Sequence, residues 1–194
     1  MSGFSWHLRC FPNGVRHFGF AFVLTFCMWP LQGATLERLS FDDMVQKATA
    51  IVRGTVTASR AAPHGPIVYT HYTLQVTETF KGTPGSMLDM VVPGGVANNI
   101  RQSFAGTPSF RTGDDYVFFL WTGQSELTYI LGLTQGLFAL TPGTPGNPLA
   151  IRGASKEIML EPGTGRQVKD QTVVMHLSDL RSLIASTLKG TQTH

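Results

Sequence analysis

Both cysteines of this chain lie in its first thirty-four residues, and this placement constrains the fold more than any other feature. Cys10 and Cys27 precede 160 residues that contain no further cysteine. A domain of that length buries roughly 70% of the surface that its unfolded chain exposes, so it can form a hydrophobic core without covalent cross-links. We therefore expect residues 35–194 to fold as a single domain with no disulfide, no reactive thiol and no thiolate metal ligand.

The first thirty-four residues have the composition of a secretory signal peptide. Arg9 and Arg16 precede an uncharged, apolar stretch at 18–29 that ends at Pro30, and cleavage is expected near Ala34. A basic region, an apolar region and small residues at the exit are the three parts of such a leader. The stretch is shorter than the ~20 apolar residues that a spanning helix needs. The sequence thus predicts a signal peptide at 1–34 and a secreted or periplasmic protein with no membrane anchor after cleavage.

A lipid anchor at Cys27 is the alternative to simple cleavage. Leu24 lies three residues before Cys27, but Phe26 is far bulkier than the small residue expected before a lipidated cysteine, so we favour cleavage near Ala34. No asparagine lies in an N-x-Ser/Thr sequence. The lack of glycosylation sites, together with the lack of cysteines, favours a protein of the bacterial cell envelope or secreted fraction.

The charge of the mature chain argues against a nucleic-acid partner. Without Arg9 and Arg16, 13 Lys and Arg face 12 Asp and Glu, a net charge of +1. Proteins that bind nucleic acid usually carry a clustered basic surface. We expect no nucleic-acid partner.

The clearest periodic pattern is an alternation over 68–80. Apolar side chains occupy even positions such as Leu74, and polar side chains occupy odd positions such as Thr73. This alternation predicts a strand that buries one face and exposes the other. Gly54, inside the β-branched run 50–58, predicts a bulge. The run 116–121 has no polar alternation, which predicts a strand covered on both faces or closed into a barrel.

Helices are expected at both ends of the mature chain. Ser40 and Asp43 have the spacing of a capping box for a helix over 41–49, and Ser178 is the expected cap of a helix that stops at Gly190. Between them the pattern predicts a strand at 87–92, a long polar loop at 96–114, a hairpin of 127–133 with 137–140, a turn-rich connector at 141–148 and a weaker hairpin of 156–160 with 167–174.

Five or six antiparallel strands between two short helices suit a small closed barrel, because closure leaves no exposed strand edge. The segments 51–56, 72–82 and 113–120 follow the first helix in an order that resembles the netrin-like module. That module is the OB-type barrel of tissue inhibitors of metalloproteinases and of complement C-terminal domains. The resemblance implies a mainly β fold, a small OB-type (netrin-like) antiparallel β-barrel with a short N-terminal helix and a C-terminal helix. The barrel core would span about 41–140, and a C-terminal hairpin and helix would span 150–190.

The chain is also similar to uncharacterised exported bacterial proteins that carry a Pro-Gly-Gly turn and a Gly-Asp/Glu-x-Tyr-x-x-Phe-Leu strand, here 93–95 and 113–120. The metalloproteinase inhibitors use an N-terminal cysteine to coordinate the catalytic zinc of the protease. Here the expected mature end is Thr35, and no cysteine is near it.

Local motifs for catalysis or metal binding are lacking. The histidines of the mature chain, at 64, 71, 176 and 194, do not form a metal-binding motif. No G-x-S-x-G or phosphate-binding loop occurs. The paired acids at 42–43 and 114–115 fit a helix N-terminus and a turn. We expect no catalytic residue, no bound metal and no cofactor.

The most promising binding segment is the loop 93–113. Two aromatic and two basic side chains follow an exposed glycine bend, and such residues are enriched in binding hot spots. The alternative is that Phe104 and Phe110 fold back to plug a barrel end while the arginines are solvated. The candidate binding residues are Gly94, Gly95, Arg101, Phe104, Phe110 and Arg111.

The sequence therefore predicts a monomeric, non-enzymatic protein that binds another envelope or secreted protein. Two alternatives remain open. One is an inhibitor or accessory protein of an extracellular metalloprotease, and the other is a hydrolase whose site has no recognisable local motif.

Overall fold

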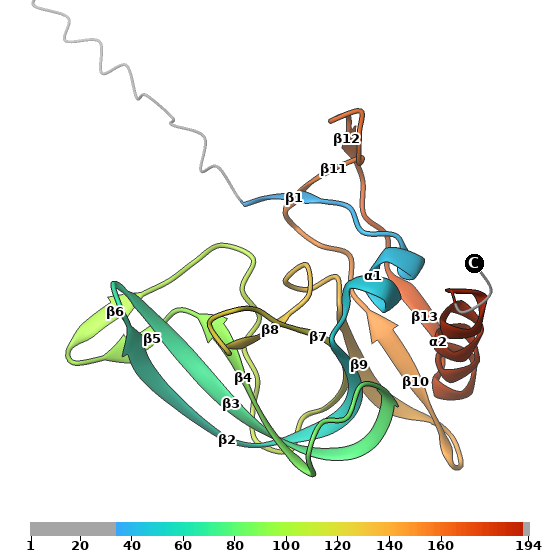
Figure 1. Cartoon of the computed structure of the whole chain (residues 1–194), viewed down its shortest axis with the longest axis horizontal. Helices are drawn as coiled ribbons and strands as arrows, with labels where there is room; N and C mark the ends of the chain where they lie inside the picture. The colour runs from blue at the N-terminus through green and yellow to red at the C-terminus, as the bar shows by residue number, and fades with distance from the viewer. Residues whose placement is uncertain (1–33, 192–194) are drawn as a thin grey trace, which may run out of the picture. The chain divides into compact units, whose positions relative to one another are not determined.

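The computed structural model describes residues 34–191, so the predicted leader lies outside the described residues. The described residues belong to one compact unit. The fold is mainly β: 51% of the described residues lie in strands, and the same part of the chain contains two helices (Figure 1). In chain order the elements are β1 (Thr35–Glu37), α1 (Phe41–Lys47), β2 (Ala50–His64), β3 (Ile67–Lys81), β4 (Met87–Pro93), β5 (Gly95–Ala97), β6 (Ile100–Gln102), β7 (Asp115–Thr122), β8 (Thr128–Ile130), β9 (Leu137–Thr144), β10 (Asn147–Arg152), β11 (Ile158–Leu160), β12 (Gln167–Val168), β13 (Val173–His176) and α2 (Leu177–Thr191).

The largest sheet has eight strands in the order β13-β10-β9-β7-β2-β3-β4-β8, and β8 pairs with β7 as well. β7 therefore has three partners. One edge pairs with β2, and the other pairs with β9 at Tyr116–Phe118 and with β8 at Leu120–Thr122. β4 and β8 meet in parallel through a single pair, Val91 with Tyr129. The pairings β2–β3–β4–β8–β7–β2 thus form a closed cycle, from which β9, β10 and β13 extend.

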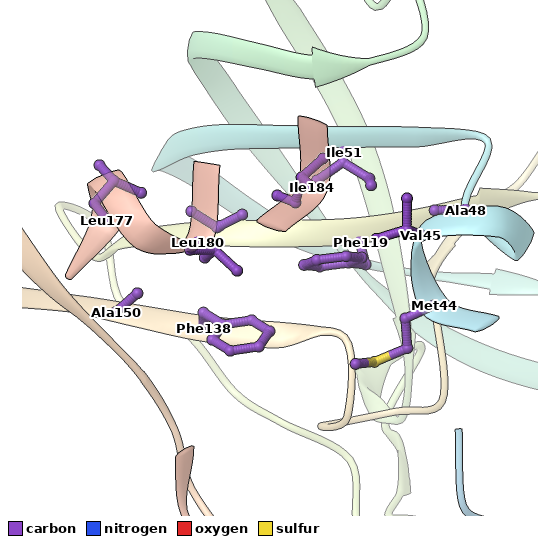
Figure 2. Close-up of a cluster of buried hydrophobic side chains, with 11 residues drawn as sticks. Met44, Val45, Ala48, Ile51, Phe119, Phe138, Ala150, Leu177, Leu180 and Ile184 are labelled. Carbon is purple, nitrogen blue, oxygen red and sulfur yellow. The ribbon is translucent and has the colours of Figure 1, made fainter. Parts of the chain in front are cut away.

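Two hydrophobic cores lie on opposite faces of β7. Phe118 and Leu120 belong to a core that the strands of the closed cycle supply. Val117 and Phe119 belong to a second core beneath the two helices. Figure 2 shows Leu180 and Ile184 of α2 pointing toward the sheet strand that carries Phe119. The apolar run is therefore covered on both faces over Val117–Leu120, one of the two arrangements that the sequence predicts, whereas Trp121 at its end is exposed.

Several predicted elements are confirmed. Ser40 and Asp43 form the capping box of α1, although the helix ends at Lys47. The pairing of β2 with β3 shifts register between Arg53 and Gly54, where the bulge was expected. On β3 the even side chains, with Leu74 fully buried, face the core. The predicted hairpin of 156–160 with 167–174 forms only in part: β11 pairs with β12, whereas Val173 and Val174 belong to β13, which pairs with β10.

Other predicted elements are wrong. The segments 127–133 and 137–140 do not pair with each other, because β8 pairs with β7 and β4 while β9 pairs with β7 and β10. The predicted connector at 141–148 is mostly strand, since β9 runs to Thr144 and β10 begins at Asn147. The hairpin of β9 with β10 thus forms in a stretch whose proline and glycine content favours a loop.

The C-terminal helix differs from its prediction at both ends. It begins at Leu177 and continues through Gly190 to Thr191. Ser178 lies inside the helix, and its N–H donates to the side-chain oxygen of Asn147, 3.1 Å away on β10. A side chain from another element therefore satisfies an N–H that a local cap would otherwise serve.

Candidate functional site

The segment that follows β4 leaves the sheet through two glycines with left-handed backbones. Gly94 and Gly95 have φ of 108° and 137°. A side chain at Gly95 would place its Cβ 2.7 Å from the hydroxyl of Thr70, so only glycine fits there. The Thr70 hydroxyl in turn donates to the carbonyl of Gly94 at 2.7 Å. Both predicted site glycines thus fix the point at which the chain leaves β4.

A short hairpin, β5–β6, follows this bend. Its turn residues Asn98 and Asn99 both have positive φ, 51° and 60°, as in the two-residue turns whose twist matches that of paired strands. The sequence predicts a long loop over 96–114, but the structure contains this hairpin within that segment. The Asn-Asn pair supplies the turn, and the flanking strands are only three residues long, too short for a periodic pattern to reveal.

Gln102 fastens the base of this hairpin to the turn between β2 and β3. Its side-chain oxygen accepts from the N–H of Val68 at 2.7 Å, and its side-chain nitrogen donates to the carbonyl of Pro66 at 2.9 Å. The amide of Gly94 also donates to the carbonyl of Val68 at 2.8 Å. The hairpin is thus held against the sheet by bonds at its base, while its tip makes none of these contacts.

Apolar side chains on this hairpin face solvent. Val96 is 50% exposed, Ile100 56% and Phe104 40%, and Arg101 beside them is exposed. These are three of the eight large exposed hydrophobic side chains in the described part of the chain. Val96 pairs with Arg101 on one face of the hairpin, and Ile100 pairs with Ala97 on the other. We call the exposed residues Val96, Ile100, Arg101 and Phe104 together the hairpin patch. Sequence reasoning selected Arg101 and Phe104 but missed Val96 and Ile100, because their exposure depends on a hairpin that the pattern did not predict.

Phe110 lies elsewhere, in the core of the closed cycle. It is buried, and its ring packs edge-on against Tyr72 at 5.0 Å and against Tyr116 at 5.2 Å. For Phe110 the folded-back alternative therefore describes the structure, whereas Phe104 remains exposed. Arg111 is exposed near the start of β7, where its backbone N–H donates to Asp114. The six candidate residues are thus divided between a bend, an exposed patch, the core and a turn.

Several acidic side chains and one histidine have structural partners. Asp43 accepts from the Ser40 hydroxyl, which lowers the pKa of the Asp43 carboxyl. Asp115 pairs with Arg53 at 2.6 Å, and His71 lies 2.7 Å from Asp89. Among residues 34–191 no three His, Cys, Asp or Glu side chains gather as metal ligands.

A cavity of about 380 Å³ lies between the 106–107 segment and the 153–157 segment. Tyr116 lines it, and burial, with a contribution from Asp114, raises the pKa of this phenol. Glu157 also lines it, with one carboxylate oxygen buried and without a hydrogen-bond partner. Ser155 and Lys156 line it as well, and the Ser155 hydroxyl accepts from the backbone N–H of Glu157 at 3.1 Å.

No model of a known protein family matches the chain, and no curated protein matches its sequence significantly. Within the described residues, no helix is long and apolar enough to span a membrane. The function must therefore be argued from the arrangement of residues described above.

Proposed function

We propose that the chain is an exported, monomeric, non-enzymatic protein that binds another protein of the cell envelope or secreted fraction through the hairpin patch. The observation that carries this proposal is an anchored hairpin segment whose apolar side chains are exposed. Val96, Ile100 and Phe104 are exposed, while Gln102 and Gly94 hold the base in place. A fixed segment loses little conformational entropy on binding, so its apolar contacts are available for affinity.

Export is supported by the leader composition at 1–34, and the absence of cysteine from residue 35 onward suits a fold that needs no disulfide. The predicted mature chain has a net charge of only +1, which does not favour nucleic acid as a partner. A protein partner outside the cytosol is consistent with this charge.

We further infer that the closed cycle of β2, β3, β4, β8 and β7 is an OB-type, netrin-like barrel. This assignment is supported by the number of strands, five, and by the one parallel contact, between β4 and β8. It is also supported by the position of β7, which pairs with both β2 and β8 in a Greek-key-like order. The core that contains Phe118 and Leu120 would then be the barrel interior. In such a barrel the β5–β6 hairpin belongs to the connection between the third and fourth strands.

The metalloprotease-inhibitor alternative gains no support from the described residues. Thr35–Glu37, which would follow the predicted cleavage site, forms β1 and pairs in parallel with β11. A segment held in a sheet is poorly placed to enter the active site of a protease.

The test is a comparison of two triple variants in capture experiments with the secreted and envelope fractions. Replacing Val96, Ile100 and Phe104 by serine should reduce capture of the partner at least tenfold, since one good anchor contributes roughly 2 kcal/mol. Because these side chains are exposed, the melting temperature should change little.

The matched control replaces three equally exposed apolar side chains elsewhere, Met87, Ile158 and Val174, by serine. This control should capture the partner as well as the parent protein does. Undiminished capture by the hairpin variant, or equal losses in both variants, would contradict a role for the hairpin patch.

A further inference from the structure

A row of aromatic side chains crosses the outer face of the large sheet, away from both cores. Ring centroids lie 6.2 Å apart for Trp121 and Tyr129, 6.1 Å for Tyr129 and Tyr69, and 6.3 Å for Tyr69 and His64. The residues come from β7, β8, β3 and β2, so segments far apart in sequence build the row. None of the four belongs to either hydrophobic core.

Strand register explains why this row faces outward. Leu120 and Ile130 form a register pair whose side chains are buried in the core of the closed cycle. Trp121 and Tyr129 form the next pair, and successive side chains of a strand point to opposite faces. Trp121 is accordingly 44% exposed. An exposed indole beside two phenols is a combination enriched at binding sites.

The rings stand as separate ridges and do not form a flat surface. The planes of Trp121 and Tyr129 differ by 32°, those of Tyr129 and Tyr69 by 67°. A flat ligand such as a cellulose-like glycan stacks best on coplanar rings, whereas ridges leave spaces that accept compact rings from the side. The geometry therefore favours a ligand with small projecting apolar groups.

Beside Trp121 and Tyr129 lies a hollow of about 410 Å³ whose lining is uncharged. Gln124 and Ser125 contribute polar groups, and Gly123 leaves room for the indole, since a Cβ there would lie 2.7 Å from the Trp121 ring. Burial, together with a hydrogen bond to Tyr129, raises the pKa of the Tyr69 phenol, so this ring is neutral as well. Among the side chains that line the hollow, Tyr129, Gln124 and Ser125 carry phenol O–H, amide N–H and hydroxyl O–H donors, and Trp121 carries an indole N–H.

We propose that this aromatic groove, formed by Tyr69, Trp121 and Tyr129 with the 123–125 loop, binds an uncharged proline-rich peptide in the polyproline II conformation. Proline has no N–H, and polyproline II has no internal hydrogen bonds, so such a peptide offers free carbonyl acceptors to a groove rich in donors. Its pyrrolidine rings are compact apolar groups that pack between aromatic side chains. The groove is separate from the hairpin patch, and the proposal does not depend on the function proposed for that patch.

The experiment uses the compact unit from Gln32 to His194, in which Trp121 is the sole tryptophan, since the other two, Trp6 and Trp29, lie before it. Titration with decaproline should change the Trp121 fluorescence in a saturable way. A glycine–serine peptide of equal length should leave it unchanged, and so should cellohexaose. No saturable change with decaproline, or a saturable change with cellohexaose instead, would overturn the proposal.

Variants measured by calorimetry localise the binding. Trp121→Ala should weaken decaproline binding at least tenfold. Gly123→Ala should weaken it too, because the new methyl group would lie 2.7 Å from the Trp121 ring and displace the indole, although the tryptophan itself is still present. Phe104→Ala and Leu183→Ala, which remove other exposed apolar side chains, should bind decaproline as the parent does. Unchanged affinity in both Trp121→Ala and Gly123→Ala would overturn the groove assignment. If Trp121→Ala fails to fold, Gly123→Ala alone decides.

Discussion

Gln135 shows how one polar side chain can determine the position of a segment far away in sequence. It is 1% exposed, and its side-chain oxygen accepts from the N–H of Leu39 at 2.8 Å. Its side-chain nitrogen donates to the carbonyl of Glu37 at 3.0 Å. The turn after β8 thereby satisfies backbone groups of the segment that leads into α1, as buried polar groups in folded proteins require.

We expect Gln135→Met to destabilise the fold by about 2 kcal/mol. The substitution introduces an apolar side chain of similar length, but it leaves the Leu39 N–H without its acceptor, and an unsatisfied group costs about 1–3 kcal/mol. Chemical denaturation measures the change. Gln75→Met, on the exposed face of β3, is the control and should cost under about 0.5 kcal/mol. Equal losses at the two positions would show that the Gln135 bonds contribute nothing specific.

At the scale of elements, an ion pair connects β10 to the segment that precedes β13. Arg152 and Asp170 lie 2.9 Å apart, with side chains 10% and 2% exposed. Burial opposes ionisation of Asp170, but hydrogen bonds from the Ser155 and Gln171 backbones and the charge of Arg152 outweigh it, so the pKa of this carboxyl is lowered. A carboxyl whose pKa is lower in the folded state stabilises the fold at neutral pH and loses that contribution as acid protonates it.

Asp170→Asn should therefore lower stability at pH 7, by about 3 kcal/mol, because it leaves Arg152 buried without its counter-charge. The difference from the parent should begin to shrink as the pH falls below about 4, where the carboxyl of the unfolded chain takes up protons, and should be lost only at still lower pH, where the folded carboxyl with its lowered pKa is protonated too. Denaturation at a series of pH values tests both statements. A difference that stays constant down to strongly acidic pH would show that the carboxylate charge is not responsible.

The predictability of these elements from sequence depended on their length and on local contacts. The 68–80 alternation and the Ser40–Asp43 cap lie within single elements, and both are as predicted. The pairing of β8 and the exposure of Val96 and Ile100 depend on contacts across the fold, which no local pattern encodes. For the same reason Phe110 could not be assigned to the core from its place in a polar segment. The candidate binding set therefore includes one core residue, Phe110, and omits two exposed ones, Val96 and Ile100, and its role in binding stays a prediction.

At the scale of the whole molecule, the closed cycle is unevenly closed. β2 and β3 pair along nearly their full length, from Ile51 with Lys81 to His64 with Ile67. β4 and β8 share only the pair Val91 and Tyr129. The cycle therefore has one weak junction, and the aromatic groove lies over it, since Tyr129 belongs to both.

Hydrogen exchange should reveal this junction. Amides of β8, Thr128–Ile130, should exchange much faster than those of Leu74 and Val76 in β3, because local opening requires fewer hydrogen bonds to break. Mass spectrometry of exchanged peptides resolves the two segments. Comparable protection of β8 and β3 would mean that the junction opens only with the whole domain.

The three partners of β7 also affect the order of folding. Its β2 partner lies about sixty residues earlier in the chain, whereas its β9 partner lies about twenty residues later. The hairpin of β2 with β3 and the pairing of β3 with β4 need only nearby contacts and can form early. Loop closure over many residues is slow, so addition of β7 is the step that we expect to limit the folding rate. A nascent chain that ends before residue 115 lacks Phe118 and Leu120, and it would keep the apolar side chains of β2, β3 and β4 exposed until translation supplies them.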